Sequence, residues 1–239
     1  MKNFFRKIIS KFSKYSIIYE NAFDLLKVMN FHDIDVVLDV GASWGSYAKT
    51  LRRFGFKNKI ISFEPISDSH SKLLKNSLND DDWQVHKKII VSNKKVKKLL
   101  INVSKDFDNS SLLNSTKLHT ENHQNAKYSH KEEIECDTLD NLIDYYSIDE
   151  KNLMLKIDVQ GSEMDVLKSG INNLTKFKLV QIELSLQPLY EDQILYKEII
   201  DFMNDNNFDI WSIYPGYKKK SIGQLYQFDA IFYNQTNYK

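Results

Sequence analysis

The sequence predicts one α/β domain whose sheet is largely parallel. Three observations predict it: short apolar runs alternate with helical patterns, turn residues follow several of the runs, and the chain has only 239 residues. The hydrophobic fraction is 42% and the aromatic fraction is 13%, which is enough to build a core of that size. We expect residues 35–239 to form this domain and residues 1–34 to form an N-terminal helical extension.

The short apolar runs are rich in β-branched residues, which is typical of buried strands. Such runs occupy 36–40, 59–63, 83–91, 97–103, 133–137, 153–159 and 179–184. Helical patterns occupy 17–29, 47–54, 67–78, 138–146, 162–168 and 192–204. The chain ends with strands at 208–213 and 227–233, which we expect to form an antiparallel pair at one edge of the sheet.

Residues 1–14 carry five basic and no acidic side chains, interleaved with phenylalanine and isoleucine at helical spacing. This segment either packs on the domain as an added helix, which we favour, or lies on an anionic membrane surface. No apolar run approaches the roughly 18 residues of a membrane-spanning helix. We therefore expect a cytoplasmic protein, with contact to the inner face of the membrane through residues 1–14 as the alternative.

Composition also limits the partners. The net charge is +1, so no overall field favours nucleic acid, and we expect no nucleic-acid partner. Cys136 is the only cysteine, which excludes an internal disulfide framework and a cysteine-based zinc cluster. The lysine runs at 94–98 and 218–220 are interpreted as solvated faces, with contact to an anionic acceptor such as a sugar nucleotide as the alternative.

Asp39, Gly41 and Gly45 mark a turn between the first predicted strand and the next helix. Two of the seven glycines fall here, where they let the backbone pass close to a ligand while the helix presents unpaired N–H groups. A dinucleotide pyrophosphate favours the spacing G-x-G-x-x-G. An acid before the first glycine instead suits a ligand with an ammonium group, such as S-adenosylmethionine. A tight turn without a ligand is the alternative.

Glu64 ends the second predicted strand, 23 positions after Gly41. An acid about 20 residues past a glycine loop, at a strand end, can accept hydrogen bonds from both ribose hydroxyls. Together, the loop and the acid favour a nucleoside site, although a solvent-facing carboxylate is the simpler alternative. Ala42, Pro65 and Ser92, which adjoin these strand ends, complete the predicted cofactor contacts.

Lys156 and Asp158 lie two positions apart on a predicted strand and therefore share a face. A lysine in so apolar a strand is costly to bury unless it is paired, so it can neutralise carboxylates beneath the site. Glu183 ends the next strand, and two neighbouring carboxylates can raise one pKa and create a base that works near neutral pH. We predict Asp158 and Glu183 as the acceptor-side pair, with Lys156 beside them. An internal ion pair or solvated strand ends are the alternatives.

These motifs resemble the FkbM family of S-adenosylmethionine-dependent methyltransferases. The resemblance rests on residues 37–42, 63–65, 110–112, 138–140, 155–163, 166–170 and 182–184, and covers about 36–235. It implies a Rossmann-like, seven-stranded methyltransferase sheet, mostly parallel with an antiparallel edge strand. It also implies S-adenosylmethionine as the cofactor. The expected reaction is O-methylation of a hydroxyl on a small-molecule or glycan acceptor, as in polysaccharide biosynthesis.

The chain departs from the family pattern in two places. It has Gln160-Gly161-Ser162-Glu163 where Glu-Gly-His-Glu is common, so no role of that histidine can be carried over. The polar segment 104–131 lacks clear periodicity, which predicts a long loop. It has no firm match in the family, and we expect it to help set acceptor choice. It contains His119, His123 and His130, but no acid stands between the first two as in H-E-x-x-H, and we predict no metal site.

Two other functions remain open at this point. A nicotinamide-dependent oxidoreductase would share the doubly wound fold, but the third glycine is missing and Asp39 would stand beside the pyrophosphate. A catalytically degenerate domain could serve as a binding module in glycan assembly. The intact Gly41, Gly45 and Glu64 argue against that module, whereas the absent histidine favours it.

Overall fold

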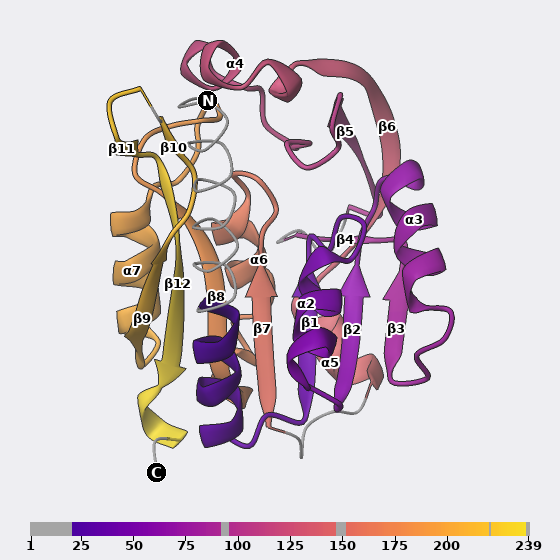
Figure 1. Ribbon diagram of the computed structural model, residues 1–239, viewed down its shortest axis with the longest axis vertical. Coiled ribbons are helices and arrows are strands. Elements are labelled where there is room, and N and C mark those ends of the chain that lie inside the picture. Colours follow the sequence, from indigo (N-terminus) through magenta and orange to yellow (C-terminus); the bar gives the residue numbers. More distant parts are fainter. Residues whose placement is uncertain (1–20, 92–95, 147–151, 220, 238–239) are drawn as a thin grey trace, which may run out of the picture.

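The computed structural model describes residues 21–91, 96–146, 152–219 and 221–237. Its centre is a seven-stranded sheet in the order β3-β2-β1-β7-β8-β12-β9 (Figure 1). The bounds are β1 Val36–Val40, β2 Lys59–Phe63, β3 Trp83–His86, β7 Leu153–Ile157, β8 Phe177–Ser185, β9 Phe208–Pro215 and β12 Gln227–Asn234.

The first five strands in that order run parallel, and β12 runs antiparallel to both β8 and β9. The antiparallel pair therefore lies at one edge, as the sequence predicts. β12 is the reversed strand and lies one place in from the edge strand β9. The predicted α/β class, with a mostly parallel Rossmann-like sheet, is confirmed.

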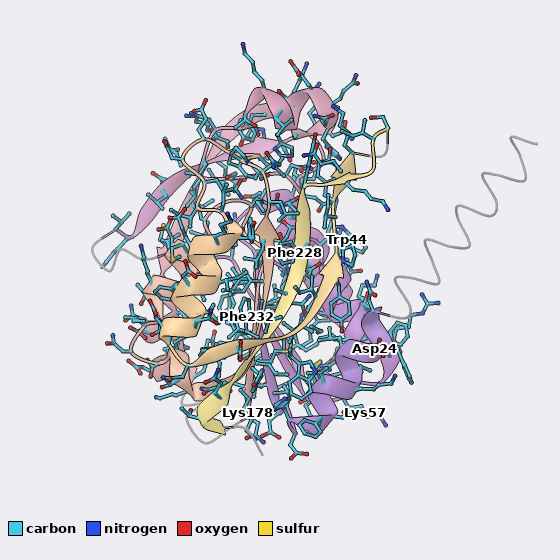
Figure 2. All side chains as sticks on the ribbon, turned by 90° about the vertical axis from the view of Figure 1, so that its left-hand side faces the viewer. Asp24, Trp44, Lys57, Lys178, Phe228 and Phe232 are labelled. Carbon is cyan, nitrogen blue, oxygen red and sulfur yellow. The ribbon has the colours of Figure 1, made fainter. Side chains whose placement is uncertain are left out.

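Helices cover both faces of the sheet because alternate side chains of each strand point to opposite faces. In β1, Leu38 joins a core with α5 (Leu139–Tyr146), α6 (Glu163–Ser169) and α7 (Tyr196–Asp205). Val37 joins the core on the other face, with a helix over residues 21–31 and α2 (Ser46–Phe54) and α3 (Ser67–Ser77). Figure 2 shows Phe228 and Phe232 along β12, and both belong to the core on the α7 side.

The prediction of a single strand over 83–91 is wrong, because this segment forms two separate strands. β3 ends at His86, opposite the last residue of β2, and β4 (Ile89–Ile90) then leaves the main sheet. β4 pairs with β6 (Tyr128–Asp137), which also pairs with β5 (Lys98–Ser104). Ile89 packs with Ile101 and Val103 in a small separate core, so the apolar run is divided between two sheets.

The polar segment 104–131 is not a long loop, since it contains α4 (Lys117–Asn122), a short 3-10 turn at Gln124–Ala126 and the start of β6. We call residues 98–137 the cap. The cap lies beyond the carboxyl ends of β1, β2 and β7 (Figure 1). It is attached to the domain by the Ser111 hydroxyl, which donates to the backbone oxygen of Gln160 at 2.6 Å. The backbone N–H of Ser67, at the start of α3, donates to Glu132 of the cap at 3.1 Å.

Residues 21–31 belong to the domain core, to which they contribute Leu25, Leu26 and Met29. The predicted helix over 1–14, with its alternative membrane contact, lies outside the described residues, as does Ser92. In the described part of the chain, no helix has the length and apolar character required to cross a membrane. Lys218 and Lys219 of the basic run near the C-terminus form β10 (Lys218–Lys219), which pairs with β11 (Gln224–Leu225).

Candidate active site

A cavity of about 380 Å³ lies between the carboxyl ends of β1, β2, β7 and β8 and the cap. Ligands of doubly wound sheets bind at this edge, where the strand order reverses. The main sheet contributes Gly41, Glu64, Asp158 and Glu183 to its lining, so these four residues of the predicted cofactor and acceptor sides meet in one cavity. The cap contributes further lining residues, which are Ile101, Phe107, Asp108, Asn109, Ser110, His119 and His123.

Gly41 begins the turn after β1 and has φ +81°, a conformation that favours glycine. A Cβ at this position would overlap the backbone carbonyl oxygen of Asp158. At Gly45, a Cβ would lie 2.7 Å from Leu73 and 2.8 Å from the ring of Trp83. The close packing of the protein itself therefore requires both glycines. Gly41 and Ala42 line the cavity, whereas Gly45 lies outside its lining.

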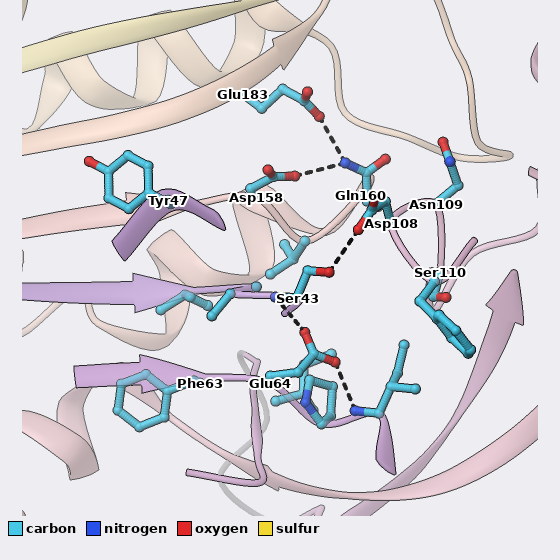
Figure 3. Close-up of a pocket in the computed structure, with 18 of the residues that line it drawn as sticks. Ser43, Tyr47, Phe63, Glu64, Asp108, Asn109, Ser110, Asp158, Gln160 and Glu183 are labelled. Atoms are coloured by element: carbon cyan, nitrogen blue, oxygen red, sulfur yellow. Dashed lines mark hydrogen bonds between the residues drawn. The ribbon is translucent and has the colours of Figure 1, made fainter. Parts of the chain in front are cut away.

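Glu64 follows β2 and lies beside this turn at the edge of the cavity (Figure 3). Its two carboxylate oxygens accept hydrogen bonds from the backbone N–H groups of Ser43 and Ile66, each at 2.9 Å. The residue is only 5% exposed, and burial raises its pKa to about 7 despite these two bonds. Pro65 and Phe63 line the cavity beside it. The predicted acid and the glycine turn therefore form one fixed unit.

Asp39 lies beneath the cavity and is not among the residues that line it. Its carboxylate is fully buried, 3.5 Å from the ammonium group of Lys156, and accepts a hydrogen bond from the Ser62 hydroxyl at 3.1 Å. Burial raises the pKa of Asp39, and Lys156 opposes that shift. Asp39 therefore has no side-chain surface in the cavity that a ligand could contact directly. It acts on the cavity through its ion pair with Lys156.

Lys156 connects Asp39 to the acceptor side of the cavity. Its ammonium group lies 3.3 Å from a carboxylate oxygen of Asp158 and donates to the backbone oxygen of Gly41 at 3.2 Å. Burial lowers the pKa of Lys156, but the carboxylates of Asp158, Asp39 and Asp229 more than offset this and raise it above its usual value. Lys156 therefore stays charged, as a buried group with several carboxylates around it must.

The predicted pair of Asp158 and Glu183 is joined by a residue that sequence reasoning did not assign to the site. The amide nitrogen of Gln160 donates to Asp158 at 2.7 Å and to Glu183 at 3.0 Å (Figure 3). Gln227 on β12 also donates to Glu183, at 2.7 Å. The only sequence signal was the departure from the family pattern at Gln160. No local signal identified Gln227, which reaches Glu183 because β12 pairs with β8.

The three histidines of the cap do not form one group. His119 is buried in the cavity wall, where its Nε2 lies 3.1 Å from Asn109 Oδ1, and burial lowers its pKa to about 4. His123 also lines the cavity and meets the ring of Tyr217 edge-on. His130 lies on β6 and is exposed. The described residues contain no cluster of three or more histidine, cysteine, aspartate or glutamate side chains that could hold a metal ion.

The strand order and the cavity at its switch point define a Rossmann-like methyltransferase fold. Residues 39–210 match the family described as Methyltransferase FkbM domain, and the chain belongs to that family. A methyltransferase family supports S-adenosylmethionine as the cofactor, as the sequence predicts.

The chain is also similar to two known proteins. It is 26% identical over 184 residues to the 2-O-methyltransferase NoeI of Sinorhizobium fredii, covering 75% of this chain and 74% of that protein. It is also similar to the crystal structure of magnesium protoporphyrin IX methyltransferase from Synechocystis with bound SAM. That match has a TM-score of 0.50 and 10% identity, and covers 91% of this chain and 78% of the other. The second likeness shows the fold alone.

Proposed function

We propose that this chain is an S-adenosylmethionine-dependent O-methyltransferase whose acceptor is a hydroxyl of a sugar, a glycan or a related small metabolite. The observation that carries the proposal is one cavity with Glu64 and the glycine turn on one side and the pair of Asp158 and Glu183 on the other. An oxygen acceptor agrees with the similarity to a 2-O-methyltransferase. The family match gives no support to a nicotinamide-dependent oxidoreductase.

Glu64 binds the ribose in this proposal. Each of its oxygens accepts one backbone N–H and retains a lone pair for a hydroxyl. Phe63, Ile89 and Ile90 give this end of the cavity an apolar wall against which a base can pack. Ala42 and Pro65 border the same end. When bound, S-adenosylmethionine supplies an activated methyl group on its sulfonium.

The acceptor lies between the pair of carboxylates and the cap. Asp158 and Glu183 offer acceptors, while the amides of Gln160 and Gln227 are next to them. Hydroxyls both donate and accept, so this mixture suits a polyol. The carboxylates, with Asp108 from the cap, would repel the phosphates of a nucleic acid, which supports a small-molecule or glycan acceptor instead.

Binding of S-adenosylhomocysteine should weaken as the pH falls through about 7. Burial raises the pKa of Glu64 to about 7, and the ionised carboxylate is the better acceptor for ribose hydroxyls. Above this pKa Glu64 is charged and binding is strongest; below it a proton occupies one acceptor position. Isothermal titration on either side of pH 7 measures the effect, and Glu64→Gln should remove it.

Glu163→Gln is the matched control for that titration. Burial raises the pKa of Glu163 to about 7 as well, but its side chain lies outside the cavity lining. This variant should keep the pH dependence of binding. If Glu163→Gln removed the dependence and Glu64→Gln kept it, Glu64 would not be the ribose-binding acid.

Asp158→Asn should lower turnover by about 10²-fold and leave the affinity for S-adenosylhomocysteine nearly unchanged. Asp158 lies on the acceptor side, and its carboxylate contacts Lys156 and Gln160, away from Glu64. Steady-state kinetics and isothermal titration on the same preparation measure the two quantities. Unchanged turnover in this variant would remove Asp158 from the acceptor side.

Mass spectrometry of glycans from cells with and without the gene tests the acceptor class. We expect one or more glycans to lose the mass of one CH₂ group when the gene is absent, and we favour polysaccharide precursors made in the cytoplasm. A chain that binds S-adenosylhomocysteine but transfers no methyl group to any cellular glycan or small metabolite would instead be a degenerate binding module.

A further inference from the structure

The two carboxylates of the acceptor side are held in different ways. Asp158 has partners at both oxygens, because Oδ1 accepts from the Gln160 amide at 2.7 Å and Oδ2 lies 3.3 Å from the ammonium of Lys156. Glu183 has both of its partners at one oxygen, because Oε2 accepts from Gln160 at 3.0 Å and from Gln227 at 2.7 Å. Among the described residues, no hydrogen-bond donor reaches Glu183 Oε1, and Glu183 lines the cavity.

We propose that Glu183 Oε1 takes the proton of the acceptor hydroxyl, and that Gln160 is the positioning residue that leaves this oxygen free. The assignment rests on the proposed function. The O–H bond of the acceptor breaks and its proton moves to Oε1. The electron pair of the hydroxyl oxygen forms the new bond to the methyl carbon on the sulfonium of S-adenosylmethionine. The bond from that carbon to sulfur breaks, and its electron pair stays on sulfur, so the charges balance.

Gln160 is held firmly enough to position both carboxylates. Its side-chain oxygen accepts a hydrogen bond from the buried Tyr190 hydroxyl at 2.7 Å, so its NH₂ group faces the carboxylates. Its backbone oxygen accepts from Ser111 of the cap at 2.6 Å, and its φ is +56°. An NH₂ group has two hydrogens, and each carboxylate accepts one of them. A carboxylate at position 160 could not do this and would add a third negative charge.

The surroundings of Glu183 favour a base that is ready to accept a proton. Burial raises its pKa, and the carboxylates of Asp158, Asp229 and Glu163 raise it further, whereas Lys156 opposes the shift. These groups come from β7 and the turn after it, from β12 and from α6. A base whose pKa is moved up toward the working pH transfers protons more effectively. Asp158 instead has a structural role, because its carboxylate contacts both Lys156 and Gln160.

Two substitutions at Gln160 test the proposal. Gln160→Met removes both donors and should lower kcat by about 10²-fold, since the carboxylates are no longer held in place. Gln160→Glu adds a charge and should move the acidic limb of the kcat–pH profile upward by about one pH unit. Gln84→Glu, on the exposed surface of β3, adds the same charge far from the pair and should leave the profile unchanged.

Carbon-13 NMR titration of the Glu183 carboxyl separates this proposal from the proposed function. The pKa of Glu183 should rise in Gln160→Glu whether or not an acceptor is known, and unchanged S-adenosylhomocysteine affinity would show that the variant is folded. If the pKa of Glu183 rises in Gln160→Glu but the wild-type protein transfers no methyl group, the result contradicts the proposed function and not the positioning role. An unchanged Glu183 pKa in Gln160→Glu, or a Glu183→Gln variant with wild-type kcat, would overturn the proposal.

Discussion

Gly41→Ala is expected to lower the free energy of unfolding by roughly 2–6 kcal/mol, the sum of backbone strain and overpacking. The strain arises because φ is +81° at this position, and the overpacking because the new Cβ would overlap the carbonyl oxygen of Asp158. Asp158 would have to move, so the variant should also bind S-adenosylhomocysteine poorly. Urea denaturation of both proteins, followed by circular dichroism, measures the loss.

Gly55→Ala separates strain from overpacking. Gly55 ends α2 with φ +103°, but a Cβ there would meet nothing within 4 Å. This control should lose only the cost of strain, about 1–3 kcal/mol, and keep its ligand affinity. Equal losses at Gly41 and Gly55 would show that the contact between the turn and Asp158 contributes nothing.

Lys156→Met is expected to lower the free energy of unfolding by about 3–5 kcal/mol near neutral pH. Lys156 is buried beside the carboxylates of Asp39 and Asp158, and its removal leaves Asp39 as an uncompensated charge in the core. Burial already raises the folded-state pKa of Asp39 above 3.8, and losing Lys156 raises it further. As the pH falls through that higher pKa, Asp39 takes up a proton and the cost disappears. The stability difference from wild type should therefore shrink on acidification, which denaturation at several pH values measures.

Two further variants control the Lys156 experiment. Adding Asp39→Asn to Lys156→Met removes the unpaired charge and should restore a large part of the stability at neutral pH. Lys57→Met changes an exposed lysine (Figure 2) and should alter stability by less than about 0.5 kcal/mol. If the double variant were no more stable than Lys156→Met, the buried charge on Asp39 would not be the cause of the loss.

Local sequence patterns predicted much of the fold and several of the residues that line the cavity. β1, β2 and β7 are buried on both faces and therefore appear as continuous apolar runs, and Gly41 and Glu64 follow such runs directly. The break between β3 and β4 was missed because both pieces are apolar, and only their long-range partners distinguish them. Within the cap, residues 104–131 were predicted as a loop because the start of β6 is mostly exposed and gives little periodicity.

The remaining misses come from side-chain direction and from distant pairing. Asp39 is the fourth residue of β1 and points to the same face as Val37, where Lys156 and Ser62 enclose its carboxylate, so it does not line the cavity. Gln227 is 44 positions from Glu183 and meets it only through the pairing of β12 with β8. Neither relation can be deduced from neighbouring residues alone.

Isothermal titration of S-adenosylhomocysteine into the wild-type chain, with NAD as the comparison ligand, tests the cofactor site most directly. We predict binding of one S-adenosylhomocysteine per chain, weakened by Glu64→Gln, and no binding of NAD. Absence of S-adenosylhomocysteine binding to folded protein, or equal binding of NAD, would contradict the assignment of this cavity.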